Sequence, residues 1–324
     1  MIISRTPLRI SFCGGGSDLP SYYRRFGGAV LSMSIARYVY LSMHDYFGNK
    51  GFILKYSQLE TPGSAEEINH RILREVFRDY GIVGVDFNSS ADVPAGTGLG
   101  SSSAFTVGLL NLCNAYLGRF EGRTVLAARA CEVEIDRLGE PIGKQDQYGC
   151  ALGGLNFIEF HPDESVTCEA VPITLAMRQR LERNLVMFYL GSTRSASAIL
   201  TRQAAAIEHD ARAVANLHEM VGLARRLREA IIGDVDVLGP LMHEGWMRKR
   251  ELAAGITNPL VDETYERVRA AGATGGKLLG AGQAGFLLVY APDAARERVI
   301  SALPNLQAYD VRIDSIGTTI IYSD

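Results

Sequence analysis

Apolar and polar residues follow two different periods along this chain of 324 residues. Segments rich in β-branched and aromatic residues, bounded by turn residues, predict strands. These segments are residues 2–12, 38–46, 52–56, 83–91, 155–160, 166–171, 185–190, 274–279, 286–290 and 318–322. Apolar residues three or four positions apart instead predict helices. The helices are expected at residues 65–80, 101–117, 123–138, 195–232, 236–254 and 292–303. The mixture predicts an α/β (α+β) fold.

The pattern changes near residue 153: a predicted hairpin and one further strand follow, and long helical stretches begin at about residue 195. A chain of this length can form one large domain or two of ordinary size. We expect an N-terminal domain over residues 1–175 and a C-terminal domain over residues 176–324. Because no low-complexity linker lies between them, two packed domains with a cleft are favoured over separate units.

Composition narrows the class of protein. Hydrophobic residues make up 47% and charged residues 21%, which is typical of a soluble globular protein. The formal net charge of −3 argues against binding to nucleic acid or an anionic membrane. No signal peptide or run of about 18 apolar residues is present, and the five cysteines contain no CxxC pair. We therefore expect a cytoplasmic protein, with a homodimer as the default assembly.

The most informative segment is residues 92–103, DVPAGTGLGSSS, which follows a predicted strand and opens a predicted helix. Its alternating glycines allow a turn whose N–H groups point inward, and its serines lie where a helix N-terminus favours anions. A serine hydroxyl there can also bind Mg²⁺. The alternative is a turn with a serine N-cap, which requires fewer such residues. No Gly-Lys-Ser/Thr follows, so this is not a Walker A loop.

A second glycine cluster lies at residues 277–286, where Gly280, Gly282 and Gly285 spell G-x-G-x-x-G. A dinucleotide-binding fingerprint requires a helix directly afterwards. Here a predicted strand follows at residues 286–290, so a dehydrogenase is excluded by context. We expect a strand–loop–strand turn close to the first glycine loop, and a plain hairpin remains the alternative.

Candidate carboxylates lie in residues 131–148. Glu134 lies on a predicted helix and could reach Mg²⁺, while Asp146 follows a loop punctuated by glycine and proline. Lys144 would lower the pKa of Asp146 if their side chains converge. Alternatively, Glu134 and its acidic neighbours form a solvated helix face.

The N-terminal segment, residues 5–18, joins a strand to a glycine loop that ends in a carboxylate. Arg9 lies in the middle of the strand, where an arginine usually requires a partner. Asp18 could accept hydrogen bonds from two sugar hydroxyls. The alternative is a glycine-rich turn capped by Ser17 or Asp18.

Taken together, the three segments resemble the GHMP kinase superfamily. Residues 94–103 match its phosphate motif P-x-G-x-G-L-G-S-S-S without departure. The substrate motif lies before this segment and the late glycine motif after it, which is the family's order. Residues 9–20 depart from the galactokinase-like G-E-H-x-D-Y loop. With residues 143–148 and 153–157, they resemble the heptose and fucose kinase branch, and most closely the D-glycero-D-manno-heptose 7-phosphate kinases.

The resemblance implies a two-domain fold with the active site in the cleft between the domains, and ATP and Mg²⁺ as cofactors. It implies transfer of the γ-phosphate to the anomeric hydroxyl of heptose 7-phosphate, on the way to nucleotide-activated heptose. Asp146 would be the catalytic aspartate and Arg9 the cation beside it. Ser102 and Glu134 would bind the metal. The phosphate-binding residues would be Pro94, Gly96, Gly98, Leu99, Gly100, Ser101, Ser102 and Ser103.

The expected sugar-binding residues come from three loops: Gly14, Gly15, Gly16, Ser17, Asp18, Lys144, Gln145, Arg194, Gly280 and Gly282. Lys144 and Arg194 are candidates for the substrate's own phosphate because each lies in a short polar loop. Either could instead pair with a nearby carboxylate or with solvent. An L-fucose or other unphosphorylated sugar 1-kinase is a competing function, and a catalytically silent sugar or nucleotide sensor is another.

Overall fold

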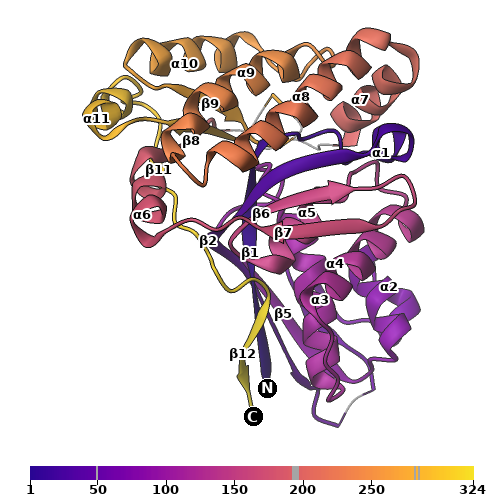
Figure 1. Ribbon diagram of the computed structural model, residues 1–324. Coiled ribbons are helices and arrows are strands. Elements are labelled where there is room, and N and C mark those ends of the chain that lie inside the picture. The colour runs from indigo at the N-terminus through magenta and orange to yellow at the C-terminus, as the bar shows by residue number, and fades with distance from the viewer. Residues whose placement is uncertain (49, 192–196, 281, 284) are drawn as a thin grey trace.

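The computed structural model describes residues 1–48, 50–191, 197–280, 282–283 and 285–324. Two β-sheets form its framework (Figure 1). The larger sheet has the order β12-β1-β2-β5-β3-β4, and β6 and β7 join it through β2. Its strands are β1 (Ile2–Cys13), β2 (Gly28–Asp45), β3 (Ile53–Lys55), β4 (Leu59–Glu60), β5 (Val85–Ala91), β6 (Leu155–Phe160), β7 (Val166–Ala170) and β12 (Thr319–Ser323). The smaller sheet has the order β11-β8-β10-β9, from β8 (Leu185–Tyr189), β9 (Gly275–Leu278), β10 (Phe286–Tyr290) and β11 (Ala308–Asp310).

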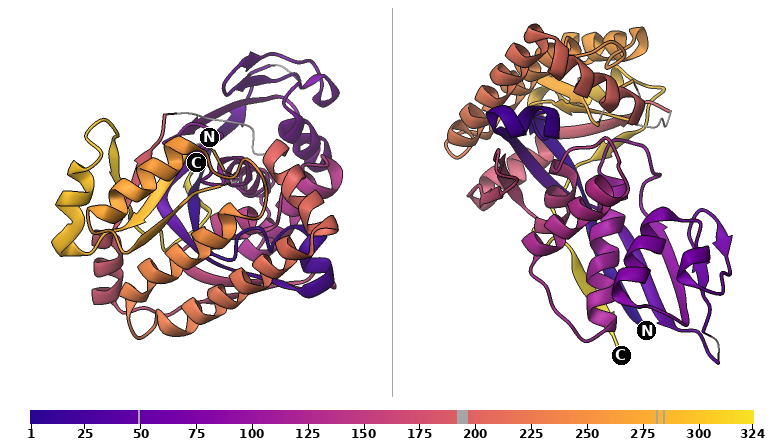
Figure 2. Two further views of the ribbon diagram at one scale, coloured as in Figure 1. Left: turned by 90° about the horizontal axis from the view of Figure 1, so that it is seen from above. Right: turned by 90° about the vertical axis from the view of Figure 1, so that its right-hand side faces the viewer.

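Helices pack against both sheets. On the larger sheet lie α2 (Arg71–Tyr80), α3 (Ser101–Tyr116), α4 (Arg123–Cys131) and α5 (Gln145–Leu152), with α3 and α5 in contact with β1 and β2. Around the smaller sheet lie α6 (Leu175–Asn184), α9 (Leu238–Arg250), α10 (Pro259–Ala270) and α11 (Asp293–Ser301). Near the junction lie α1 (Pro20–Phe26), α7 (Ser197–His209) and α8 (Ala211–Ala230). Figure 2 shows the two sets of elements as an upper and a lower body joined by the long strands.

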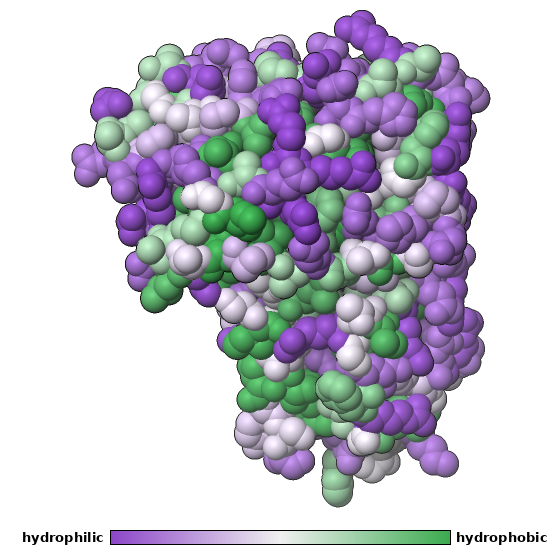
Figure 3. Space-filling view, viewed as in Figure 1, coloured by the Kyte–Doolittle hydropathy of each residue, from purple (hydrophilic) through white to green (hydrophobic). Residues whose placement is uncertain are grey.

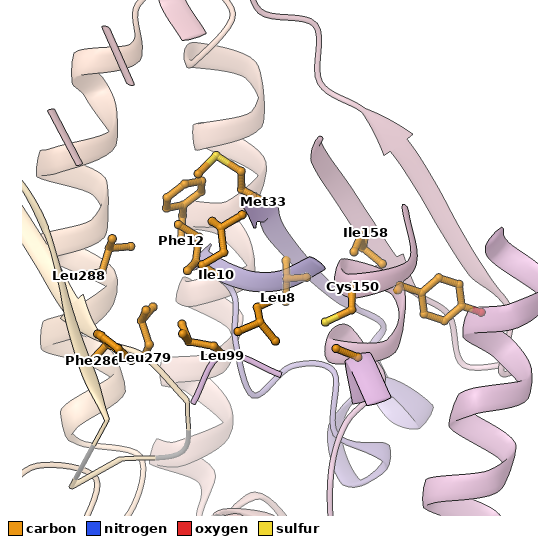
Figure 4. Close-up of a cluster of buried hydrophobic side chains, with 14 of the residues drawn as sticks. Leu8, Ile10, Phe12, Met33, Leu99, Cys150, Ile158, Leu279, Phe286 and Leu288 are labelled. Carbon is orange, nitrogen blue, oxygen red and sulfur yellow. The ribbon is translucent and has the colours of Figure 1, made fainter. Parts of the chain in front are cut away.

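One continuous hydrophobic core runs through both sheets. Leu8, Ile10 and Phe12 of β1 lie between residues of the larger sheet and those of the smaller one (Figure 4). Leu99 and Leu279, which are fully buried, anchor the two glycine loops in this core. The loops are therefore held by packing that both parts of the chain share.

Most of the predicted elements are present, but several boundaries differ. The strand expected at residues 38–46 is part of β2, which begins ten residues earlier at Gly28. The helix expected at residues 65–80 is a 3₁₀ turn (Ala65–Glu67) followed by α2. The helix expected at residues 195–232 divides into α7 and α8, because Asp210 is extended and its side chain caps α8. α1, α6, α10, β4 and β11 were not expected.

The end of the chain returns to the first sheet. β12 pairs antiparallel with β1, and the amino group of Met1 contacts Asp324 (Figure 1). Residues 319–323 therefore lie in the sheet of the predicted N-terminal domain. For all other residues, the domain boundary expected after residue 175 stays a prediction.

The surface in Figure 3 changes character along the molecule. Hydrophilic side chains dominate the helical upper part, while apolar side chains gather lower down, toward β12. Ile321 and Tyr322 of β12 are about half exposed. Within the described residues, no helix has the length and apolarity needed to cross a bilayer. The expected homodimer remains a prediction.

Candidate active site

A cavity of about 870 Å³ brings together residues from β1, both glycine loops, α3, α5, α7 and α9. Most of the residues expected from the sequence line it: Arg9, Gly16, Asp18, Pro94, Gly96, Gly98, Gly100, Ser101, Ser102, Ser103, Glu134, Gln145, Asp146 and Gly280. Segments that are up to 270 residues apart in the sequence thus meet at one site.

Asp146 and Arg9 form the charged centre of the cavity. Arg9 is almost fully buried in β1, and its Nε and Nη2 donate to Asp146 Oδ1 at 2.8 and 2.6 Å. Its Nη1 donates to the carbonyl oxygen of Gly98 at 2.8 Å. One guanidinium therefore ties the carboxylate to the phosphate loop. Among the described residues, none donates a hydrogen bond to Asp146 Oδ2, so this oxygen is available to a ligand.

The side chains of Lys144 and Asp146 do not converge, so the condition stated for an effect of Lys144 on Asp146 is not met. The Nζ of Lys144 donates to Glu164 Oε2 at 2.6 Å and lies 4.8 Å from the centre of the Tyr23 ring. Lys144 is the N-cap of α5 and does not line the cavity. The cation beside Asp146 is therefore Arg9. Arg194 lies outside the described residues.

The two glycine loops interlock. Gly98 and Gly280 both have left-handed φ, at 81° and 77°. A Cβ on Gly98 would lie 2.6 Å from the carbonyl oxygen of Leu279, and one on Gly280 would lie 2.5 Å from Gly98 Cα. Only glycine permits such an approach. The late loop joins the antiparallel strands β9 and β10, so the expected strand–loop–strand turn beside the first loop is confirmed.

The phosphate loop leads directly into α3, with Gly100 as the N-cap at φ 76°. The first backbone N–H groups of a helix have no partner within the helix and attract anions, an effect that the helix dipole strengthens. Ser101, Ser102 and Ser103 occupy this first turn at the cavity wall. The arrangement suits the phosphates of a nucleotide.

Glu134 lies beside the first turn of α3, on a π-helical segment (Glu132–Arg137). It is 1% exposed, and it accepts hydrogen bonds from Ser102 Oγ and Ser103 Oγ at 2.9 Å each and from Gln147 Nε2 at 2.7 Å. Burial raises the pKa of Glu134, while these hydrogen bonds act in the opposite direction. Single π-helical turns often occur at functional sites.

The residues present fit a magnesium ion. Mg²⁺ is usually held by one or two carboxylates together with nucleotide phosphates. Ser102 Oγ and Glu134 Oε1 lie 2.9 Å apart at the edge of the phosphate loop, which gives one hydroxyl and one carboxylate ligand. Within the described residues there is no group of three or more His, Cys, Asp or Glu that could hold a metal. Binding of the ion would therefore depend on the nucleotide.

This geometry predicts that Glu134→Gln weakens Mg²⁺-dependent binding of an ATP analogue. Removing a residue that only hydrogen-bonds a metal ligand typically lowers metal affinity ~10–100-fold. The loss of Mg²⁺ affinity in Glu134→Gln should be at least this large, because a ligand itself is changed. Calorimetric titrations at several Mg²⁺ concentrations would measure it. Asp136→Asn is the matched control, because Asp136 lies exposed on the same helical segment. An unchanged Mg²⁺ dependence in Glu134→Gln would exclude this carboxylate as a metal ligand.

Asp18 is a second buried carboxylate of the cavity. It is 2% exposed, and its Oδ1 accepts from Gly16 N at 2.9 Å and from Gln145 Nε2 at 3.0 Å. Burial raises the pKa of Asp18, and the charge of Asp146 raises it further. The carboxylates of Asp18 and Asp146 therefore lie within electrostatic reach of each other. Gln145, which binds Asp18, directly precedes Asp146 in the sequence.

Several other expected residues support the loops instead of lining the cavity. Gly14 packs against the carbonyl oxygen of Ala29, to which Ser17 Oγ donates at 3.1 Å. Gly282 packs against Ile256. Gly15 lies near the side-chain amide of Gln145, where an added Cβ would be 3.7 Å away.

Lys249 and Gln203 are polar residues of the cavity that the sequence motifs did not indicate. Lys249 on α9 is 7% exposed, and its Nζ donates to the carbonyl oxygen of Gly280 at 2.8 Å. Gln203 on α7 is 1% exposed, and its Nε2 has no partner in the described structure. Both lie in long helical stretches where a single polar residue carries no signal of its own.

Another part of the cavity wall is apolar and aromatic. It includes Val39, Val93 and Phe105. The His70 ring lies 5.0 Å from that of Phe105 and 4.8 Å from that of Tyr56. Burial lowers the pKa of His70, which favours the neutral ring. No sequence motif indicated this wall, because apolar side chains in separate elements form it.

Two family descriptions match the chain. "GHMP kinases N terminal domain" matches residues 68–154, and "GHMP kinases C terminal" matches residues 220–308. Together they cover more than half of the chain. The first match includes the phosphate loop, Glu134 and Asp146, and the second includes Lys249 and the late glycine loop.

Individual relatives span the whole chain. The chain is 27% identical over 321 residues to D-glycero-alpha-D-manno-heptose 7-phosphate kinase of Campylobacter jejuni, covering 95% of this chain and 94% of the relative. It is 28% identical to a bifunctional fucokinase/GDP-fucose pyrophosphorylase of Arabidopsis thaliana, covering 95% of this chain and 31% of that protein.

Among solved structures, a D-glycero-D-manno-heptose 1-phosphate kinase from Bacteroides thetaiotaomicron superposes with a TM-score of 0.81 at 25% identity, covering 100% of each chain. The two-domain architecture expected from the resemblance is therefore confirmed. The family matches, the shared fold and the cavity built around both glycine loops agree, and the chain belongs to the GHMP kinases, a family of ATP-dependent enzymes.

Proposed function

We propose that the protein is an ATP-dependent sugar kinase that phosphorylates the anomeric hydroxyl of D-glycero-α-D-manno-heptose 7-phosphate. One observation carries the kinase chemistry. The Arg9 guanidinium joins the Asp146 carboxylate to the carbonyl oxygen of Gly98 in the phosphate loop. A hydroxyl held by Asp146 and a phosphate held by that loop are thereby brought to one point.

In this reaction the acceptor oxygen forms a bond to the γ-phosphorus, and the bond from that phosphorus to the ADP oxygen breaks. Asp146 Oδ2 would accept or orient the proton of the hydroxyl, while Arg9 holds the carboxylate in place through Oδ1. The phosphate loop and the N-terminus of α3 would hold the phosphates. Ser102 and Glu134 would hold Mg²⁺, which would neutralise charge on the nucleotide phosphates.

The aromatic wall supports a nucleotide as the donor. Tyr56, His70 and Phe105 offer flat apolar surfaces at the side of the cavity that the phosphate loop borders. A base needs mainly such walls, with a few polar groups for orientation. ATP would therefore lie with its base on this wall and its phosphates at α3.

The polar end supports an acceptor rich in hydroxyls. Gln203 Nε2 and Gln145 Oε1 are buried without a partner in the described structure. Buried polar atoms are normally hydrogen-bonded. With the Asp18 carboxylate nearby, they offer a donor and acceptors to a sugar.

Similarity to the Campylobacter jejuni enzyme supports the heptose 7-phosphate in particular. An unphosphorylated sugar such as L-fucose is the alternative, which the Arabidopsis thaliana fucokinase supports. A silent sensor is disfavoured, because Asp146, Ser102 and Glu134 are all in place. The heptose product would feed nucleotide-activated heptose, a precursor of capsule or lipopolysaccharide, in the cytoplasm.

The test is ADP release across a panel of hexoses, heptoses and their phosphates, with the phosphorylated position read by NMR. We expect the highest kcat/KM for heptose 7-phosphate and a product phosphorylated at the anomeric position. A preference for L-fucose would assign the alternative function. Saturable nucleotide binding without turnover of any sugar would contradict the kinase assignment.

A further inference from the structure

Lys249 is the buried cation of the cavity that sequence motifs do not explain. It lies on α9, which packs against β9 and β1, and its side chain reaches the cavity wall. Its Nζ donates to the carbonyl oxygen of Gly280 at 2.8 Å. No carboxylate forms an ion pair with it in the part of the chain that the structure describes.

An ammonium group has three N–H donors, and buried charges are normally paired. Within the described residues, only the bond to Gly280 uses one of these donors. Lys249 is only 7% exposed, so water satisfies little of the remainder. Two donors on a buried positive charge therefore face the cavity, which indicates an anionic ligand.

The position of Lys249 indicates which anion this is. Gly280, which holds its ammonium group, packs directly on Gly98 of the phosphate loop. Lys249 also lines the same cavity as Asp18, Arg9 and Asp146, so it lies among the charged groups of the site. The ammonium group thus lies beside the end of the phosphate loop that faces Asp146.

Arg9 already uses three of its five N–H donors within the protein. Its Nε and Nη2 donate to Asp146, and its Nη1 donates to Gly98. Phosphoryl transfer places charge on three equatorial oxygens, and enzymes place cations there. Lys249 is the further cation that the structure offers at this point.

Resting on the proposed kinase function, we propose that Lys249 binds the γ-phosphate of ATP and stabilises the transferring phosphoryl group. α9 would thus contribute a substrate-contacting residue to a site whose central pair, Arg9 and Asp146, comes from β1 and α5. The inference depends on ATP as the donor and not on the identity of the sugar.

The charge of Lys249 depends on its surroundings. Burial lowers its pKa to about 8, with Arg9 acting in the same direction and Asp18 and Asp146 opposing it. Lys277 on β9 is a further buried cation, whose Nζ donates to the carbonyl oxygen of Ser11 at 2.7 Å. The ammonium group is charged below pH 8 and loses its charge as the pH rises through that value. The kcat/KM for ATP, which reports the pKa values of the free enzyme, should therefore fall on the alkaline side.

The first experiment needs no acceptor. Titration calorimetry with Mg²⁺ compares ADP with AMP-PNP, which carries a γ-phosphate, on wild type and Lys249→Met. We expect AMP-PNP to bind at least ~10-fold more weakly to the variant, since charge-assisted hydrogen bonds are lost. The affinity of the variant for ADP should stay within about twofold of the wild-type value, because ADP lacks the γ-phosphate that Lys249 would bind. Arg248→Met is the control, because Arg248 is the neighbouring residue on α9 and does not line the cavity.

The second experiment uses the sugar that turns over best. Lys249→Met should lower kcat by ~10²–10³-fold, as loss of one transition-state donor does, with KM for the sugar nearly unchanged. Lys249→Arg should recover part of kcat and move the alkaline limb upward, because arginine stays charged. A merely structural lysine would not produce this shift.

Equal weakening of ADP and AMP-PNP would overturn the proposal, as would a loss confined to the KM of the sugar. Melting temperatures establish that each variant is folded. If Lys249→Met does not fold, the pH profile and AMP-PNP affinity of Lys249→Arg decide the question, and an alkaline limb at the wild-type position contradicts it. If no sugar turns over, the proposed acceptor fails while the nucleotide titration still tests Lys249.

Discussion

Asp146→Asn is expected to lower kcat by ~10²–10⁴-fold, the usual contribution of a positioned general base. The amide oxygen of asparagine can still accept a hydrogen bond from Arg9, so the local structure should persist. The substituted side chain cannot take up a proton from the acceptor hydroxyl. Affinity for an ATP analogue should therefore stay near the wild-type value, as measured by calorimetry beside steady-state ADP release.

The same Asp136→Asn variant controls for this substitution, because it removes an exposed carboxylate outside the cavity. Its kcat should match that of wild type. Full activity in Asp146→Asn would remove this side chain from the mechanism. A fall in nucleotide affinity that accounts for the whole loss would assign Asp146 to binding instead of catalysis.

Gly98→Ala is expected to weaken ATP binding strongly. Gly98 has a φ of 81°, and an added Cβ would meet the carbonyl oxygen of Leu279 at 2.6 Å. Backbone strain of this kind costs about 1–3 kcal/mol, before the two loops are forced apart. That free energy corresponds to ~5–150-fold in affinity if the loop must keep this conformation to bind ATP. Calorimetric titration with AMP-PNP would measure the loss.

Gly118→Ala is the matched control. Gly118 also has a left-handed φ, of 67°, but an added Cβ there would meet nothing within 4 Å. Both variants should lower the melting temperature, because alanine is strained at either position. Only Gly98→Ala should also lose nucleotide affinity. Equal AMP-PNP binding by the two variants would show that the contact between the glycine loops is not needed.

The sequence allowed the centre of the site to be predicted because its chemistry is concentrated in short segments. The glycines of the phosphate loop stand directly before a buried helix, and Arg9 stands in the middle of an apolar strand. A buried arginine needs a partner, and Asp146 is that partner. The contact between the two glycine loops was also predicted, because a strand follows the second loop.

Residues that reach the site from long helices could not be predicted. Lys249 stands between two other cations, Arg248 and Arg250, at the end of α9, so its pattern resembles a solvated helix face. Its burial results from packing of α9 against β9, which no local pattern encodes. Lys144 is the opposite case. It is close to Asp146 in sequence, but the N-cap position directs its side chain to Glu164.

The first half of β2 was missed for a related reason. Residues 28–35 are buried on both faces of the sheet, so they show no alternation of polar and apolar side chains. Glycine, serine and methionine also interrupt the β-branched residues there. By contrast, α10 carried a usable signal, since Asn258 caps it and Pro259 occupies its first position.

The return of β12 to β1 bears on how the cavity opens. The chain passes from the larger sheet to the smaller one between β7 and β8, and it comes back between β11 and β12. These two connections, together with the continuous core, restrain how the part of the chain around the smaller sheet can move relative to the larger sheet. Closure over ATP and sugar would therefore be a small movement of that part as a whole, with Lys249 carried along on α9.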